Sequence, residues 1–301
     1  MLNSTTSRLA AFTAGLAVIG GTAAAVGAAT DATPPFQDCL KVAAADAGFG
    51  KAKMTDGGHG AAPMIEPVPG SDGRRSALAG LTFRPVPRAF QAGGTATWRF
   101  SITDCNGKAV RTFEREQTKL LHLIVARTDF TGYQHLHPTL APDGTWSVRL
   151  ATPRSGRYRA IADFVVDGRK YVVGTTLTVP GRSADVPIPA PTLTASADGY
   201  DVELQRPAVL GTDTAAQLTF RITRHGRPVT DLQPYLGSYG HLVALHAPEL
   251  SYSHVHPVGE DRAAGVITFD TEFHEAGRFR LFLQFQTRGQ VHTVAFTQTV
   301  S

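Results

Sequence analysis

The stretch HLIVARTDFTGYQHLHP, residues 122–138, returns later in the same chain as HLVALHAPELSYSHVHP, residues 241–257. Laid over each other without a gap, the two copies share their first histidine, one tyrosine and an H-x-H-P motif. A repeat inside one chain indicates a duplicated structural unit. The shared histidines are His122, His135 and His137 in the first copy and His241, His254 and His256 in the second.

The duplication extends on both sides of this stretch. TWRFSITDCNGKAV, residues 97–110, is similar to LTFRITRHGRPV, residues 218–229. Residues 156–179 and 277–300 are identical at nine of 24 aligned positions. We therefore predict two copies of one domain of ordinary size, at residues 77–180 and 199–301. The stretch between them, residues 181–198, is rich in proline and is expected to be an extended, semi-rigid linker.

Each predicted domain consists of short runs in which apolar and polar residues alternate. Trp98, Phe100 and Ile102 alternate with polar neighbours, and turn residues such as Asp167-Gly168 separate the runs. A period of two with turns between runs indicates antiparallel strands. We therefore predict an all-β protein of two tandem immunoglobulin-like antiparallel β-sandwiches. The strands expected in the first domain span residues 81–84, 95–103, 119–127, 133–138, 145–150, 157–166 and 169–179.

The chain begins with a different kind of sequence. Residues 1–30 contain one arginine, then an uncharged run at residues 9–29 that is rich in alanine and glycine. This layout is typical of a secretory signal peptide, although the run is also long enough to be a membrane anchor. In either case the rest of the chain is expected to be secreted or otherwise extracytoplasmic. Residues 31–76 show little periodicity and are expected to be a flexible linker.

Composition narrows the function classes. The formal charge of +4 comes from dispersed Arg and Lys, without the basic patch of a nucleic-acid-binding protein. There is no G-x-S-x-G or H-E-x-x-H motif, and we expect no catalytic residue and no enzymatic activity. The two cysteines, Cys39 and Cys105, could form a disulfide in an oxidising compartment or could be free thiols.

The shared histidines form the candidate functional site. In a strand, alternate side chains point to one face, so Tyr133, His135 and His137 share a face. A hairpin around Asp129 would set His122 across from His135 or His137, close enough for three imidazoles to converge. Three neutral imidazoles suit a copper or zinc ion. The same reasoning applies to His241, His254 and His256.

The chief alternative is that these histidines are structural. Each H-x-H-P motif could be a polar strand end closed by proline, without any ligand. In the segment before the first domain, Met54, His59 and Met64 could also capture copper loosely, but their glycine-rich surroundings favour a mobile tether. Asp129 and Glu249 lie beside the two hairpin loops, where a carboxylate could orient a histidine or simply be solvated.

Around these residues the sequence resembles exported actinobacterial proteins of tandem β-sandwich domains that are described as heavy-metal-binding or YtkA-like. HLIVARTDFTGYQHLHP, GHLVALHAPELSYSHVHP and the G-R-Y/F-R strands that follow them carry the resemblance. It implies a secreted or membrane-associated protein with a role in metal handling at the envelope, and it names neither a metal nor a catalytic residue.

Two function classes follow. The first is an exported metal-binding protein with a histidine triad in each repeat. The second is a non-catalytic envelope interaction module, in which two immunoglobulin-like domains with structural histidines bind a protein partner.

Overall fold

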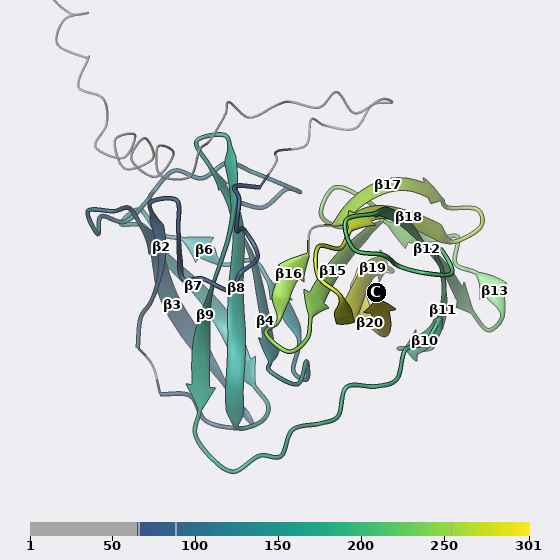
Figure 1. The fold of residues 1–301 in the computed structure, drawn as a ribbon, viewed down its shortest axis with the longest axis horizontal. Coiled ribbons are helices and arrows are strands. Elements are labelled where there is room, and N and C mark those ends of the chain that lie inside the picture. The colour runs from purple at the N-terminus through teal and green to yellow at the C-terminus, as the bar shows by residue number, and fades with distance from the viewer. Residues whose placement is uncertain (1–64, 66, 88, 254) are drawn as a thin grey trace, which may run out of the picture. The chain divides into compact units, whose positions relative to one another are not determined.

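The computed structural model describes residues 65, 67–87, 89–253 and 255–301. None of these residues is helical, and they form two β-sandwiches, drawn in blue to teal and in green to yellow in Figure 1. Within this part of the chain no helix has the length and apolar character needed to cross a membrane. The expected signal or anchor at residues 1–30 and the segment with Met54, His59 and Met64 lie outside it.

The first repeat is a sandwich of two antiparallel sheets. One sheet holds, in spatial order, β1 (Ala77–Leu78), β2 (Leu81–Pro85), β3 (Gly94–Thr103), β7 (Thr145–Thr152) and β6 (Thr139–Leu140). The other holds β5 (Gln134–Leu136), β4 (His122–Arg127), β8 (Gly156–Val166) and β9 (Arg169–Val179). The predicted strands of this repeat are present, with shorter ends for β4 and β5.

The second repeat has the same plan, which confirms the prediction of two tandem all-β sandwiches. Its first sheet holds β10 (Thr194–Ala197), β11 (Tyr200–Gln205), β12 (Ala215–Arg224), β18 (Val266–Glu272) and β17 (Val255–Asp261), with β13 (Arg227–Pro228) beside β12. Its second sheet holds β14 (Leu232–Gln233), β19 (Gly277–Thr287), β15 (Gly240–His246), β16 (Ser251–Ser253) and β20 (Gln290–Val300).

Alternation along the strands builds the core of each sandwich. In β3 the side chains of Trp98, Phe100 and Ile102 are fully buried. Phe113 then joins the two sheets, because its ring meets Trp146 edge-on at 4.9 Å and Phe164 edge-on at 5.5 Å between ring centroids. Such edge-to-face pairs add to the stabilisation from buried apolar area.

Tight turns set the register of the long hairpins. Asp167 and Gly168 both have positive φ, 53° and 66°, in the turn between β8 and β9, as the Asp-Gly pair predicts. A second such turn lies at Gln117 and Thr118, with φ of 45° and 71°, and it delays the start of β4 to His122 instead of the expected Lys119.

The two repeats differ in where the chain changes sheets. In the first, β5 stays paired with β4 through Leu136 before the chain crosses to β6. In the second, Ser253 is the last described residue that pairs with β15, and Val255 pairs with β18 in the other sheet. Because Val255 aligns with Leu136, the second repeat leaves its hairpin earlier along the chain.

The repeats pack on each other through equivalent strands. One buried apolar cluster contains Ile124 and Ile161 of the first repeat and their aligned counterparts, Val243 and Phe282. Tyr133 stacks on Phe282 at 3.8 Å between centroids, with the rings nearly parallel at 4°. The same face of each repeat is therefore used on both sides, as in an isologous dimer interface.

Residues 67–75, which we call the lead-in segment, cross both repeats. The Val68 amide donates to Lys170 of β9 at 2.9 Å. Asp72 accepts a hydrogen bond at 2.8 Å from the amide of Tyr252 in the second repeat. Arg74 forms an ion pair of 2.8 Å with Glu275. These contacts place the described end of the expected 31–76 linker against both sandwiches.

The other connections are also held at several points. In the proline-rich stretch, the amide of Val186 donates to Asp129 at 2.8 Å, and the second repeat's first strand begins at Thr194.

Cys105 is disulfide-bonded. The only other cysteine of the chain, Cys39, lies outside the described residues.

Candidate metal centre

Three strands bring four imidazoles together between the repeats. His122 opens β4, and its side chain shares a face with Ile124, which belongs to the apolar cluster between the repeats. His135 lies directly across from Ile124 on β5, and His137 follows that strand. His241 of β15 joins them from the second repeat. The rings point out of the core of their own sandwich, as expected. His122 and His241 are nevertheless buried, and His135 and His137 are half-buried.

The first repeat's histidines form a compact group. One nitrogen from each of His122, His135 and His137 lies within 4.8 Å of the others. The ring centroids are 5.2 Å apart for His122 and His135, and 4.8 Å apart for His135 and His137. The predicted hairpin is thus confirmed, and it brings the three histidines of the first copy together.

Two rings form hydrogen bonds through their outer nitrogens, and these bonds set their tautomers when the Gln284 amide presents its oxygen to His135. His122 donates from Nε2 to the backbone oxygen of Glu116 at 3.1 Å, which leaves Nδ1 without a hydrogen in the neutral ring. His135 donates from Nδ1 to Oε1 of Gln284 at 2.7 Å, which leaves Nε2 without a hydrogen. These two bare nitrogens, His122 Nδ1 and His135 Nε2, are 3.0 Å apart.

Two lone pairs that face each other at this distance repel unless a cation lies between them. A proton could do so only if one ring were charged, and burial opposes that charge. Desolvation lowers the pKa of His122 from 6.5 to about 4 and the pKa of His137 to about 3. It lowers the pKa of His135 and His241 well below the ordinary value. All four rings are therefore neutral at pH 7.

A shared metal ion would resolve the repulsion. Nitrogens bound at 2.0–2.1 Å from one ion stand roughly 2.9 to 3.4 Å apart for bond angles between a right angle and the tetrahedral angle. The observed 3.0 Å lies in that range. Nε2 of His137 is buried, and no described residue offers it a hydrogen-bond partner. A buried, unpaired nitrogen next to two bare ones fits a third ligand position.

His241 contributes differently. The centroid of its ring lies 4.6 Å from that of His135, with 21° between the ring planes. The centroid distance to His122 is 5.6 Å, with 10° between the planes. Rings stacked in this way direct their lone pairs along parallel planes instead of toward one point. His241 is 7% exposed and covers the group as a lid from the second repeat.

A buried ionic group supports the site from behind. Lys170 is 2% exposed and donates from Nζ to both carboxylate oxygens of Glu116, at 2.8 and 2.7 Å. Nζ of Lys170 also lies 3.4 Å from Oδ2 of Asp163. Asp163 is directly across from His122 in the β4–β8 pairing. Burial raises the pKa of both carboxyl groups, partly offset by Lys170. The ion pair holds the Glu116 backbone that accepts the His122 hydrogen bond.

The second repeat's predicted triad is not assembled in the same way. His241 lies with the first repeat's histidines, His254 falls outside the described residues, and His256 is on β17, in the opposite sheet from β15. The early change of sheet after Ser253 is the cause, because it carries His256 away from the hairpin. His256 instead lines a cleft.

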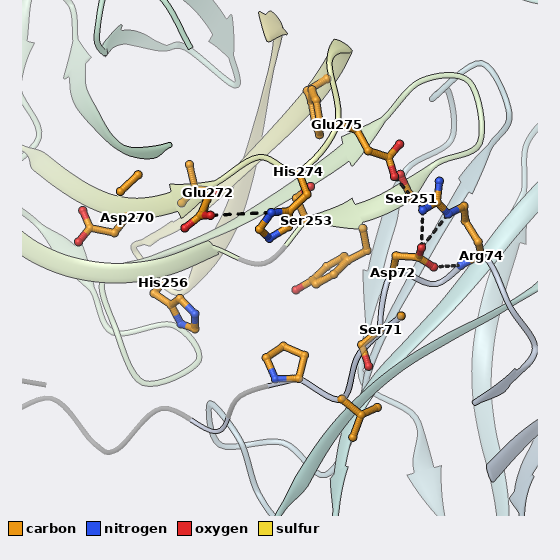
Figure 2. Close-up of a pocket in the computed structure, with 17 residues that line it drawn as sticks. Ser71, Asp72, Arg74, Ser251, Ser253, His256, Asp270, Glu272, His274 and Glu275 are labelled. Atoms are coloured by element: carbon orange, nitrogen blue, oxygen red, sulfur yellow. Dashed lines mark hydrogen bonds and ion pairs between the residues drawn. The ribbon is translucent and has the colours of Figure 1, made fainter. Parts of the chain in front are cut away.

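This cleft has a volume of about 600 Å³ and lies between the lead-in segment and the second repeat. Figure 2 shows Asp72, Arg74 and Glu275 linked at one end, with His256 and Asp270 at the other. Glu272 and His274, which line the cleft, form an exposed group with Asp213, and the possible ligand atoms of the three residues lie within 4.8 Å of one another. Exposed carboxylates of this kind are commonly only solvated.

Other polar residues have structural partners. Asp129 binds Arg127 and the Val186 amide, and Glu249 lies 3.7 Å from Arg74, so neither orients a histidine as a carboxylate there could. Nδ1 of His292 lies 3.0 Å from Oδ2 of Asp198, and Nε2 of the same ring lies 3.1 Å from Oγ1 of Thr287. This order of side chains resembles a nucleophile–base–acid array. Thr287 is fully buried, however, so no substrate can reach its hydroxyl.

Sequence reasoning missed the outer hydrogen-bond partners. Gln284 and Asp163 occupy the same aligned position in the two repeats, each directly across from the first histidine of its copy. A polar residue at this position of both repeats, in strands whose inward residues are apolar, could have indicated a hydrogen-bond partner for the histidines. The participation of the second repeat in the first repeat's site had no local signal.

No curated protein matches the sequence. Among solved structures, the Escherichia coli adhesin FdeC is 18% identical, with a TM-score of 0.26, over 77% of this chain and 65% of that one. InvD of Yersinia pseudotuberculosis is 16% identical, with a TM-score of 0.25, over 74% and 57%. The I67-I69 fragment of titin is 10% identical, with a TM-score of 0.20, over 75% and 66%. The chain spans about two thirds of these structures or less.

One family model matches most of the sequence. It is DUF8832, a domain of unknown function, and it matches twice, at residues 76–181 and 195–301. The two matches coincide with the two sandwiches and so agree with the internal repeat. The chain belongs to the DUF8832 family.

Proposed function

We propose that this protein binds a transition-metal ion, copper or zinc, through His122, His135 and His137. The observation that carries the proposal is the pair of bare nitrogens 3.0 Å apart, His122 Nδ1 and His135 Nε2, whose outer nitrogens already donate to oxygen. Neutral imidazoles are the form that binds such ions. A copper ion would be bound more tightly than zinc by the same nitrogens.

Further support comes from the surroundings of the site. Metal-binding histidines commonly donate their other ring N–H to a carbonyl or amide oxygen, which fixes the ring for the ion. His122 and His135 both do so here. The N-terminal sequence favours an exported protein, so we place this binding outside the cytoplasm, in envelope metal handling.

Metal titration of the full-length chain tests the proposal. We expect one tight site for Cu²⁺ or Zn²⁺ by calorimetry, and its loss in His122→Ala/His135→Ala. The matched control is His225→Ala/His246→Ala, because His225 is exposed in a turn and His246 bonds Glu275, so neither belongs to a group of ligand-spaced side chains among the described residues. Equal uptake by the two double variants would exclude the cluster as the site.

A second candidate is an envelope interaction module with structural histidines. The observation that favours it is the burial of the imidazoles in the contact between repeats, where they stack on one another and on His241. In that case the double variant would lose stability and no chain would bind metal tightly. The same titration, together with an unfolding curve, separates the two candidates.

A further inference from the structure

The second repeat holds the first repeat's metal ligands in place. We infer, on the basis of the proposed function, that Gln284 is a positioning residue of the metal site and that both repeats together form one site. Gln284 belongs to β19, 149 residues after His135, and its carbonyl oxygen accepts the His135 Nδ1 hydrogen at 2.7 Å.

A second hydrogen bond restrains the Gln284 amide. Its Nε2 donates to Oγ1 of Thr293 on β20 at 3.1 Å, in the orientation that presents Oε1 to His135. The side chain is 6% exposed, so water does not compete effectively for either end. An acceptor held in this way selects the His135 tautomer with a bare Nε2, which is the form needed for a metal at the centre of the cluster.

Two further contacts hold His135 from the same side. His241 lies directly across from Gln284 in the β15–β19 pairing and stacks on the His135 ring at 4.6 Å. Tyr133, two residues before His135, stacks on Phe282, two residues before Gln284. One segment of β19 therefore anchors both the ring and the strand that carries it.

This arrangement couples two equilibria. An oxygen acceptor behind a metal-binding histidine commonly changes metal affinity by about 10 to 100-fold. If docking of the second repeat tightens metal binding, metal must tighten docking by the same factor, since coupling free energy is reciprocal. The affinity of the site for metal then depends on whether the two repeats are docked.

Substitution of Gln284 in the full-length chain tests the inference. Gln284→Leu removes the acceptor, and we expect the affinity for Zn²⁺ to fall by about 10 to 100-fold. Gln284→Glu keeps an oxygen toward His135 and should restore binding to at least the wild-type level. The control is Gln286→Leu, the same change on the same strand at a side chain that bonds Gln233 instead.

A second readout distinguishes positioning from general loss of structure. With Co²⁺ in place of Zn²⁺, the visible absorption bands should shift in Gln284→Leu and return in Gln284→Glu, while Gln286→Leu should leave them unchanged. If Gln284→Leu fails to fold, Thr293→Val removes the bond that orients the amide, and it should weaken metal binding by a smaller factor.

The outcomes separate the two proposals. A wild-type chain that binds no metal contradicts the proposed function and this inference with it. Normal affinity and spectrum in Gln284→Leu, together with lost binding in His135→Ala, would overturn the inference alone. Failure of Gln284→Glu to restore binding would also overturn it, since the oxygen acceptor would then not be what the site needs.

Discussion

The surroundings of His122 and His241 differ, although the two residues occupy equivalent places in the repeats. Behind His122 lie Glu116, Asp163 and Lys170, which form a buried ionic group. The aligned residues in the second repeat are Tyr235, Gln284 and Val291, none of them charged. The first repeat thus has charged residues behind its histidine. The second repeat instead supplies a hydrogen-bond acceptor, Gln284, and a covering ring, His241, to the histidines of the first. Duplication has produced two complementary halves.

The largest difference should appear at the aligned pair Lys170 and Val291. Lys170→Met would leave the buried Asp163 and the half-buried Glu116 without their cation, and removing one partner of a buried pair costs about 3 to 5 kcal/mol. Val291 is 36% exposed, so Val291→Met should change stability by less than about 0.5 kcal/mol. Urea unfolding of both variants measures the contrast, and similar costs would show that the ionic group is not a specific support.

The next contrast is between the aligned histidines His137 and His256. His137→Ala removes the buried, unpaired nitrogen at the cluster and should weaken metal binding at least 100-fold, about 2.7 kcal/mol. His256→Ala should leave the affinity within a factor of about two, because His256 lies in the other sheet of its repeat. Competitive titration against a chelator gives both constants. A larger loss in His256→Ala would move the site to the cleft.

The metal-free protein should lose stability in acid because of its buried imidazoles. Burial lowers the pKa of His122 to about 4 and that of His137 to about 3 in the folded protein, from an ordinary value of 6.5. Below pH 6.5 the unfolded chain therefore binds protons that the folded chain excludes, so stability falls as the pH falls. The loss is at most about 1.4 kcal/mol per pH unit for His122 until its folded pKa, and it is smaller for His137, which is partly exposed and screened by solvent.

The raised pKa of Glu116 and Asp163 acts in the opposite sense, so the comparison must isolate the histidines. The difference between wild type and His122→Asn/His137→Gln, measured by urea unfolding in EDTA from pH 7 to pH 5, does this. The wild type should lose more stability than the variant over this range. Parallel curves would mean that these rings are not neutral in the fold.

The smallest contrast concerns the turn before each first histidine. Thr118 has φ of 71°, and its aligned residue, Gly237, has φ of 88°. A β-branched residue is strained in this region, whereas glycine is not. Thr118→Gly should therefore raise the free energy of unfolding by about 1 kcal/mol, and Gly237→Thr should lower it by a similar amount. Urea unfolding checks both, and opposite signs would show that the strain lies elsewhere.

Local patterns in the sequence predicted most of the fold. The period of two in β3 and β8 and the Asp167-Gly168 turn gave the strands and a hairpin, because these depend on neighbouring residues. The repeat predicted the two domains, and the turn near Asp129 predicted that His122 would meet the H-x-H motif. The observed register pairs Leu123 with Leu136, so His122 is level with His137.

The rest depended on contacts that no local pattern encodes. The change of sheet after Ser253 separates His256 from His241, although the two H-x-H-P motifs look alike. The packing of Tyr133 on Phe282 brings His241 and Gln284 to the first repeat's site across more than 100 residues. The contact between the repeats also lowers the pKa of the histidines. The sequence of one repeat could not predict this, because in an isolated sandwich these side chains would face solvent.

The lead-in segment has a mechanical consequence. Its hydrogen bonds run along β9 in the first repeat, and Asp72 and Arg74 fasten it to Tyr252 and Glu275 in the second. Tension that enters the lead-in segment through residue 65 would therefore reach both sandwiches at once, and would load several bonds in parallel before any strand is pulled from its sheet. The proline-rich connection would carry little of that force.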